Sequence, residues 1–286
     1  MGRATVCILL GLCLGGPSFA QSIGVHPIGP SDRGFVELSS VFALSPSGDE
    51  VSARHLSPQV AAGIRLTRSL SATLTVAAAY TSFRVYSEGS RSSSRMGNPL
   101  LGIHYALVEE AGGALRVGVA LGAPLVTVPG TIPTNTAAAY SDGVSVQARG
   151  MQGYWLWARN AVPIVLLLGG ERNLGSGLVI GSELQPAFLF SVNSAPSRLA
   201  LLFNASVGYR LGPLTPALRG QVLWSSRPLS GHDFAQSSVV GSVRLELSAS
   251  LFLRAESSVN LDGPYGLGGV SGATVWGTSV GLGGRF

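Results

Sequence analysis

Apolar and polar residues alternate along most of the chain, and the alternation is clearest at the C-terminus. Trp276, Val280, Leu282 and Phe286 fall on even positions, whereas the odd positions from 277 to 285 hold only glycine, serine and arginine. Because successive side chains of a β-strand point to opposite faces, this stretch is predicted to be a strand with one apolar face and one small or polar face.

The same period of two predicts twelve strands along the chain. Their approximate ranges are 34–44, 59–66, 70–80, 99–108, 114–121, 161–168, 178–190, 199–210, 214–224, 239–247, 251–261 and 274–286. The stretch 127–174 is the hardest to assign, with one strand near 161–168 after a long connection. Pro163, Pro186 and Pro216 fall inside these ranges and predict bulges or shifted boundaries, because proline removes a ladder hydrogen bond.

The connections between these strands alternate in length. Short turns are expected near 67–69, 109–113, 212–213 and 247–250, and longer loops at 45–57, 82–98, 124–160, 192–198, 225–236 and 262–272. Short turns on one side and longer loops on the other are typical of outer-membrane barrels. The sequence therefore predicts an all-β fold: a transmembrane, antiparallel, up-and-down β-barrel of about 12 strands with both termini on the short-turn side. A soluble β-sandwich is the rival architecture, but it does not account for the loop asymmetry.

The composition favours the barrel. Only 12% of the residues are charged, against about 25% in soluble domains, and no apolar run reaches the ~18 residues of a transmembrane helix. All 19 basic residues are arginine. Coding bias is the simpler explanation; the alternative is that guanidinium groups serve to bind carboxylates or phosphates.

The two ends of the chain carry targeting features. Phe286 resembles the C-terminal aromatic assembly signal of bacterial outer-membrane β-barrels, which implies a Gram-negative outer membrane, the barrel-assembly machinery, and lipid and lipopolysaccharide as partners. Residues 1–20 have a positive start, an apolar core and a Ser18-Phe19-Ala20 cleavage site, as a signal peptide does, which leaves 21–286 as the barrel domain. Cys7 and Cys13 lie in the removed segment, so the mature chain is expected to have no disulfide.

If the apolar face of each predicted strand contacts lipid, the opposite face lines the lumen. Arg244 and Glu246 beside Arg254 and Glu256 predict a cross-strand ladder of ion pairs, because unpaired charges in a narrow lumen are costly. Such a ladder fills and stiffens the interior, and surplus arginine also favours anionic solutes. The candidate pore-lining residues are Glu37, Arg65, His104, Arg116, Glu183, Arg210, Arg219, Arg244, Glu246, Arg254 and Glu256.

These features predict a porin-like channel that passes small solutes through an Arg/Glu-lined lumen. One alternative is a non-conducting structural or adhesive barrel, because the connection at 124–160 can fill a twelve-stranded bore. Within that connection, Tyr154–Trp157 is either a packed loop or anchor, or an aromatic gate. Arg84, Arg91 and Arg95, in the loop predicted at 82–98, are expected to meet lipopolysaccharide phosphates.

A second alternative is an outer-membrane hydrolase of the phospholipase kind. It lacks an assigned catalytic residue: His104 is predicted to face the lumen, and the nearness of His232 to Ser230 in sequence does not make a dyad. No pair of histidines has metal-ligand spacing, and no cofactor is expected.

Two segments, MGNPLLGIHY at 96–105 and LRVGVALGAP at 115–124, look like one hairpin. This hairpin resembles the central one of the meta-pathway phenol-degradation-type outer-membrane proteins. The resemblance implies a channel for small aromatic or apolar compounds. It carries over no ligand residues, and His104 and Arg116 predict a more polar lumen than such a conduit needs.

Overall fold

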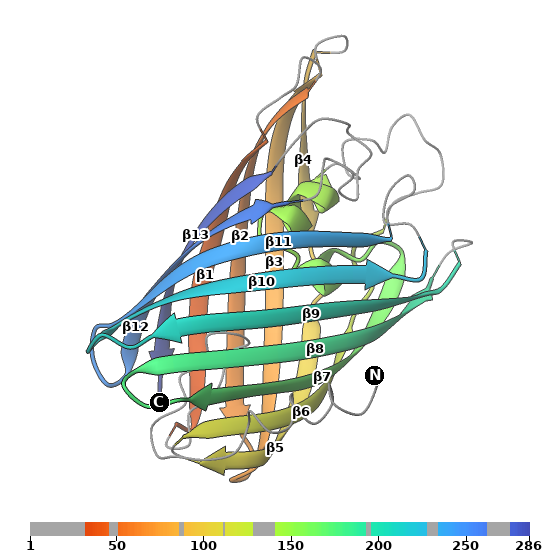
Figure 1. Cartoon of the computed structure of the whole chain (residues 1–286). Helices are drawn as coiled ribbons and strands as arrows, with labels where there is room; N and C mark the ends of the chain where they lie inside the picture. The colour runs from red at the N-terminus through yellow and green to blue at the C-terminus, as the bar shows by residue number, and fades with distance from the viewer. Residues whose placement is uncertain are drawn as a thin grey trace, which may run out of the picture.

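The computed structural model describes residues 32–45, 51–85, 89–110, 112–127, 141–192, 196–227, 234–261 and 275–286. The predicted signal peptide and His232 lie outside these ranges. The described part is a single antiparallel sheet that closes on itself, because β1 bonds to β13 on one side and to β2 on the other, and β2 bonds on to β3. Figure 1 shows the resulting barrel.

Thirteen strands make up this sheet. They are β1 (Gly34–Ser45), β2 (Val51–Arg65), β3 (Leu70–Val85), β4 (Gly89–Met96), β5 (Leu100–Glu110), β6 (Gly113–Gly122), β7 (Ala161–Asn173), β8 (Leu178–Ser191), β9 (Arg198–Tyr209), β10 (Leu214–Ser225), β11 (Ala235–Glu246), β12 (Leu251–Asn260) and β13 (Trp276–Arg285). Twelve of them close the barrel and β4 is additional, so the predicted fold class is confirmed.

The additional strand corrects the loop predicted at 82–98. The long strand β3 pairs with β5 along residues 70–75 and with β4 along residues 78–85, so β4 and β5 share one place in the wall. Gly97-Asn98-Pro99 separates them. The alternation rule missed β4 because its sequence, GSRSSSRM, has no apolar face. Figure 1 shows β4 high in the barrel, beside the upper part of β3.

The predicted division between an apolar and a polar face is confirmed. Val280 is 54% exposed and Leu282 is 49% exposed, whereas the alternating Ser279 is buried. The same pattern repeats around the wall, with Leu38, Leu101, Leu166 and Leu218 all outward and more than half exposed. A closed wall with an apolar outer surface is the arrangement that a bilayer requires, since every backbone polar group is paired within the sheet.

The prolines fit the sheet without the predicted bulges. Pro163 pairs opposite Leu189, Pro186 opposite Leu201 and Pro216 opposite Val243, each in the same register as its neighbours. Antiparallel strands alternate between hydrogen-bonded and non-hydrogen-bonded pairs, so a register can continue through a residue without an N–H. The register shift that the described strands do show lies between Ala106 and Val108, where no proline occurs.

The inner face of β13 has glycine at positions 277, 281 and 283, and a different group lies next to each of them. A Cβ added at Gly277 would collide with the Ala148 carbonyl oxygen, and one at Gly283 would collide with the Phe252 ring. At Gly281, a Cβ would lie 2.9 Å from Glu37 Oε1. The glycines predicted to make a small face therefore leave room for a lumenal segment, an ion pair and an aromatic ring.

We expect Val280→Arg to destabilise the barrel by about 2–4 kcal/mol, because it places a charge on the lipid-facing surface. Val280→Ala keeps that surface apolar and should cost much less. Urea unfolding in lipid vesicles, followed by tryptophan fluorescence, measures both. Equal effects of the two changes would argue that this face does not contact lipid.

Candidate functional site

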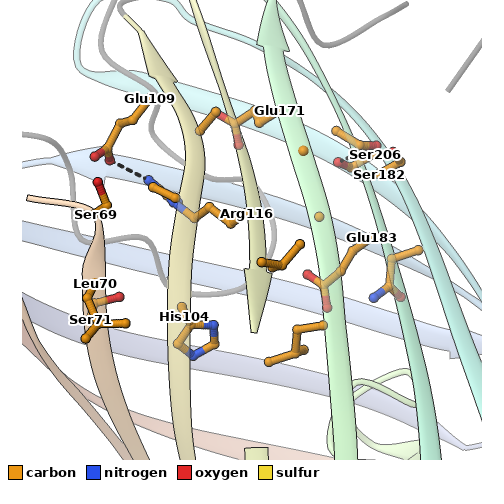
Figure 2. A pocket seen from close by; sticks show the side chains of 18 of the residues that line it. Ser69, Leu70, Ser71, His104, Glu109, Arg116, Glu171, Ser182, Glu183 and Ser206 are labelled. Atoms are coloured by element: carbon orange, nitrogen blue, oxygen red, sulfur yellow. Dashed lines mark hydrogen bonds and ion pairs between the residues drawn. The ribbon is translucent and has the colours of Figure 1, made fainter. Parts of the chain in front are cut away.

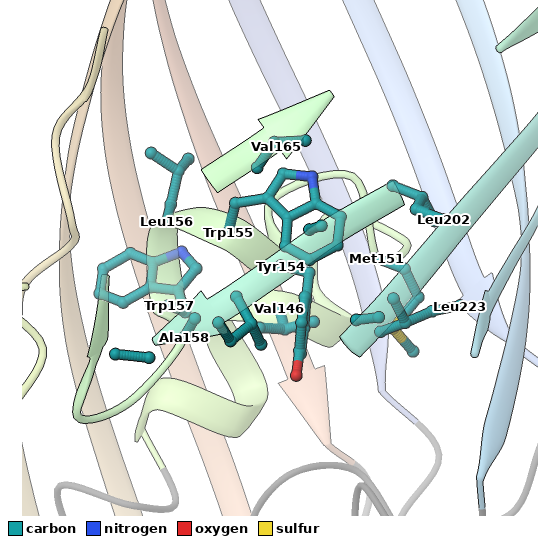
Figure 3. Close-up of a cluster of buried hydrophobic side chains, with 14 of the residues drawn as sticks. Val146, Met151, Tyr154, Trp155, Leu156, Trp157, Ala158, Val165, Leu202 and Leu223 are labelled. Atoms are coloured by element: carbon teal, nitrogen blue, oxygen red, sulfur yellow. The ribbon is translucent and has the colours of Figure 1, made fainter. Parts of the chain in front are cut away.

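Residues 141–160 fold inward and occupy the barrel, and we call this segment the plug (Figures 1 and 3). It contains a helical turn at 141–147 and the 3-10 turn η1 (Tyr154–Trp157). Tyr154, Trp155 and Trp157 are at most 3% exposed, and they belong to a cluster that includes Leu189 and Leu202 from the barrel wall. Tyr154–Trp157 is therefore a packed loop inside the barrel and not an anchor at the membrane interface.

A buried ion cluster ties the plug to the wall. The carboxylate of Asp142, whose side chain is 0% exposed, lies 3.1 Å from Arg95 Nε of β4 and 3.3 Å from Arg159 Nε. Burial raises the pKa of Asp142, and the two guanidinium groups oppose that shift. Arg95 therefore points into the lumen rather than toward lipopolysaccharide. For Arg84 and Arg91 that contact stays a prediction.

Neutral hydrogen bonds hold the plug at several other points. The hydroxyl of Ser258 donates to the Ala148 carbonyl at 2.9 Å, and the hydroxyl of Ser238 donates to the Gly150 carbonyl at 2.9 Å. Each links the plug to an inner-face serine of β12 or β11. Because these donors and acceptors are all buried, loss of a bond would leave an unpaired polar group at a cost of about 1–3 kcal/mol.

Asn98, in the break between β4 and β5, hydrogen-bonds to both ends of the connection that contains the plug. Its side-chain nitrogen donates to the Ala158 carbonyl at 2.8 Å, and its side-chain oxygen accepts from the Val126 amide at 2.9 Å. The wall is thus interrupted where one side chain can reach both the start and the end of the inward-folded connection. Asn98 has 0% exposure.

Below the plug, charged side chains from the wall form clusters in which two arginines share one carboxylate. Glu109 lies 3.1 Å from Arg65 and 2.9 Å from Arg116. Glu246 lies 2.7 Å from Arg244 and 2.6 Å from Arg285. Each cluster has one surplus positive charge, as has the Asp142 cluster of the plug.

A third wall cluster crosses the barrel interior. Glu256 lies 3.5 Å from Arg219 and 4.0 Å from Arg254, and Arg254 also contacts Glu37 at 2.6 Å. Arg254 on β12 reaches Glu37 on β1 by passing over β13, which is possible because Gly281 has no side chain there.

The ladder predicted from Arg244, Glu246, Arg254 and Glu256 has a different geometry from the one expected. Arg244 stands directly opposite Arg254 in the register of β11 and β12. Two like charges in that position repel, so each arginine turns to a carboxylate elsewhere. Arg244 lies 3.9 Å from the centre of the Phe252 ring, whose π-face stabilises a cation.

The remaining candidate lumen residues also lie on the inner side. Arg210 is 3.9 Å from Glu171, and the Gln185 amide donates to Glu183. His104 shares a 2.9 Å hydrogen bond with Thr73. The sequence does not indicate that Glu109, Asp142 or Arg149 lies in the lumen, because Glu109 falls in a predicted turn and the other two fall in the connection at 124–160, which shows no period.

Side chains from the barrel wall and the plug line two adjoining cavities. The lower cavity, of about 100 Å³, is lined by Arg65, Glu109, Arg116, Glu171 and Arg219 among others (Figure 2). The upper cavity, of about 120 Å³, lies against the plug at Arg149, Gln152 and Trp155. His104 and Leu167 line both cavities, so the two spaces meet at these residues.

Arg149 is the plug's own cation beside the upper cavity. Its Nη2 donates to the Ser57 carbonyl at 2.8 Å, and its buried Nε has no hydrogen-bond partner. Burial lowers the pKa of Arg149 to about 10, which leaves the guanidinium charged at neutral pH. No carboxylate lies within ion-pair distance of it among the described residues.

Comparison with known proteins identifies the fold. An outer-membrane channel from Pseudomonas putida F1 superposes with a TM-score of 0.57 at 12% identity, covering 96% of this chain and 99% of that one. The transport unit of the autotransporter AIDA-I from Escherichia coli gives 0.55 at 8% identity, covering 100% and 98%. The chain has the β-barrel fold of bacterial outer-membrane proteins. These two similar proteins have different roles, so the likeness specifies the fold alone. No protein-family model and no curated protein matches the sequence.

The described residues contain no group of histidine, cysteine and carboxylate side chains placed to hold a metal ion. No helix in the same ranges is long and apolar enough to cross a membrane.

We expect Asp142→Asn to loosen the plug while the barrel stays closed. The change leaves Arg95 and Arg159 without their shared carboxylate, and breaking a buried ion pair costs about 3 kcal/mol. Tryptic cleavage after Arg149 or Arg159 should become faster, with the heat-modifiable gel shift of a folded barrel unchanged. Glu110→Gln, at an exposed strand end, is the matched control. Cleavage at the wild-type rate would show that this cluster does not hold the plug.

Proposed function

We propose that this protein is a gated outer-membrane channel for small anionic solutes, with the plug as the gate. The observation that carries the proposal is the sharing of each of four carboxylates by two arginines. The clusters around Glu109, Asp142 and Glu246 each leave one positive charge in a narrow, partly dehydrated bore, where the field of a charge is weakly screened. An anion gains from this field and a cation is repelled. The cluster around Glu256 is neutral, because Glu37 also pairs with Arg254.

The plug supports gating rather than a permanently open pore. It packs against the wall through an apolar cluster, and its polar contacts are distributed over β2, β4, β11 and β12. A segment held by many weak contacts and one ion cluster can be displaced without breaking any strand pairing. The candidate pore-lining residues Arg65, Arg116, Arg219 and Arg254 would then face an open route.

The hydrolase alternative finds little support among the described residues. His104 bonds to Thr73 and lies between the two cavities, inside the barrel. The non-conducting barrel is the stronger alternative, because the plug fills the same space that a solute must cross. Conductance separates it from the channel.

We expect single-channel recordings in planar bilayers to distinguish these roles. The wild-type barrel should show small or rare steps, and Asp142→Asn should show larger and more frequent steps that prefer anions. Adding Arg65→Glu and Arg116→Glu to that variant should reduce or invert the anion preference. A folded, plug-loosened variant that stays silent would favour the structural or adhesive barrel.

A further inference from the structure

The upper cavity has two chemically different walls. Along one side lie Leu100, Ala120, Val165 and Leu167 from the barrel and Leu156 from the plug. The other side carries Gln59, Thr73 and Thr75 from β2 and β3 and Arg149 from the plug. Trp155 lies against the cavity and is held in place by a 2.5 Å hydrogen bond from its ring nitrogen to Gln185.

The polar side has hydrogen-bonding capacity that the protein leaves unused. Arg149 Nε has no partner, and neither has the side-chain oxygen of the buried Gln59. Both groups lie at the same place, because Arg149 bonds to Ser57, which precedes Gln59 by two residues on the inner face of β2. Arg149 Nε is a donor without an acceptor, and Gln59 Oε1 is an acceptor without a donor. Buried polar groups without partners are uncommon in proteins and cost free energy, so a ligand that accepts a hydrogen bond from Arg149 would relieve part of that cost.

Of the charged groups that line the cavity, Arg149 is the one placed to bind an anion, with Glu256 and Glu37 also acting on its charge. Arg254 and Glu256 also line the cavity, but Arg254 is engaged by Glu37 at 2.6 Å and Glu256 is shared with Arg219. Arg149 is the lining cation without an ion-pair partner among the described residues. A guanidinium group binds carboxylates through charge-assisted hydrogen bonds, which are about twice as strong as neutral ones.

We propose that the upper cavity binds an amphipathic organic acid. Its carboxylate accepts hydrogen bonds from Arg149, and its compact apolar body lies against Leu100, Val165, Leu167 and Leu156. The cavity combines apolar side chains with a few polar groups, as the binding sites of small organic ligands do. The inference rests on the proposed function, because it names the class of solute that this lumen takes up.

A set of probes with one apolar body tests the site. We expect 4-phenylbutyrate to bind the full-length refolded protein about tenfold more tightly than 4-phenylbutanol, through the charge-assisted bonds to Arg149. The amine 4-phenylbutylamine should bind more weakly than the alcohol, and acetate, which lacks the apolar body, should show no binding. Titration calorimetry in a non-ionic detergent gives the four affinities.

Variants of the two walls separate the contributions of charge and apolar contact. Arg149→Gln should lower the affinity for the acid to that for the alcohol and leave the alcohol unchanged. Leu167→Asn should weaken acid and alcohol alike. Arg84→Gln, on an exposed arginine of β3, is the matched control and should change neither affinity.

Three outcomes would overturn the inference: equal binding of acid and alcohol, an acid preference that survives Arg149→Gln, or no binding of any probe by a protein that conducts. The last result would leave the channel proposal intact. Conversely, acid-selective binding by a barrel that never conducts, even with Asp142→Asn, would support the site and refute the channel.

Discussion

The constraint on which this structure depends is that a barrel in a bilayer has an apolar exterior and only a narrow interior for everything polar. Each strand supplies side chains to both sides in strict alternation, so half of the wall residues must be placed in a bore with little water. Charges there cannot be hydrated individually, and burying an unpaired charge is costly. The clusters around Glu109, Glu246 and Glu256 are the solution that this chain uses.

Arginine suits these clusters better than lysine would. Its fork of donors can contact a carboxylate and a second group at the same time, and its flat face stacks on an aromatic ring. Arg254 contacts Glu37 and Glu256, and Arg285 contacts Glu246 while lying 5.3 Å from the centre of the Phe252 ring. Whatever caused the absence of lysine from the sequence, its consequence in the lumen is a network of shared contacts with a positive surplus.

The strands of the barrel wall could be predicted from the sequence, because each strand shows its two faces in its own residues. Strand 276–285 shows its lipid face and its glycine face in the residues themselves, and the structure confirms both. β4 could not be found, since its serines and arginines are compatible with a loop as well as a strand. The partners of Arg244 and Arg254 could not be found either, because the register of two strands and the room left by a glycine on β13 decide them.

The sequence indicates that the connection at 124–160 can fill the bore, but the fold and the contacts of the plug could not be predicted, for a related reason. Its residues satisfy no period, because they pack against a concave surface made by strands far apart in sequence, as Trp155 does with Gln185 and Ala148 with Ser258. The plug explains why β13 has a glycine at position 277. Gly277 faces the Ala148 carbonyl of the plug, and there is no space for a side chain between them. A barrel that served only as a wall would gain from a larger residue there, so a wall that keeps Gly277 has been fitted to its plug.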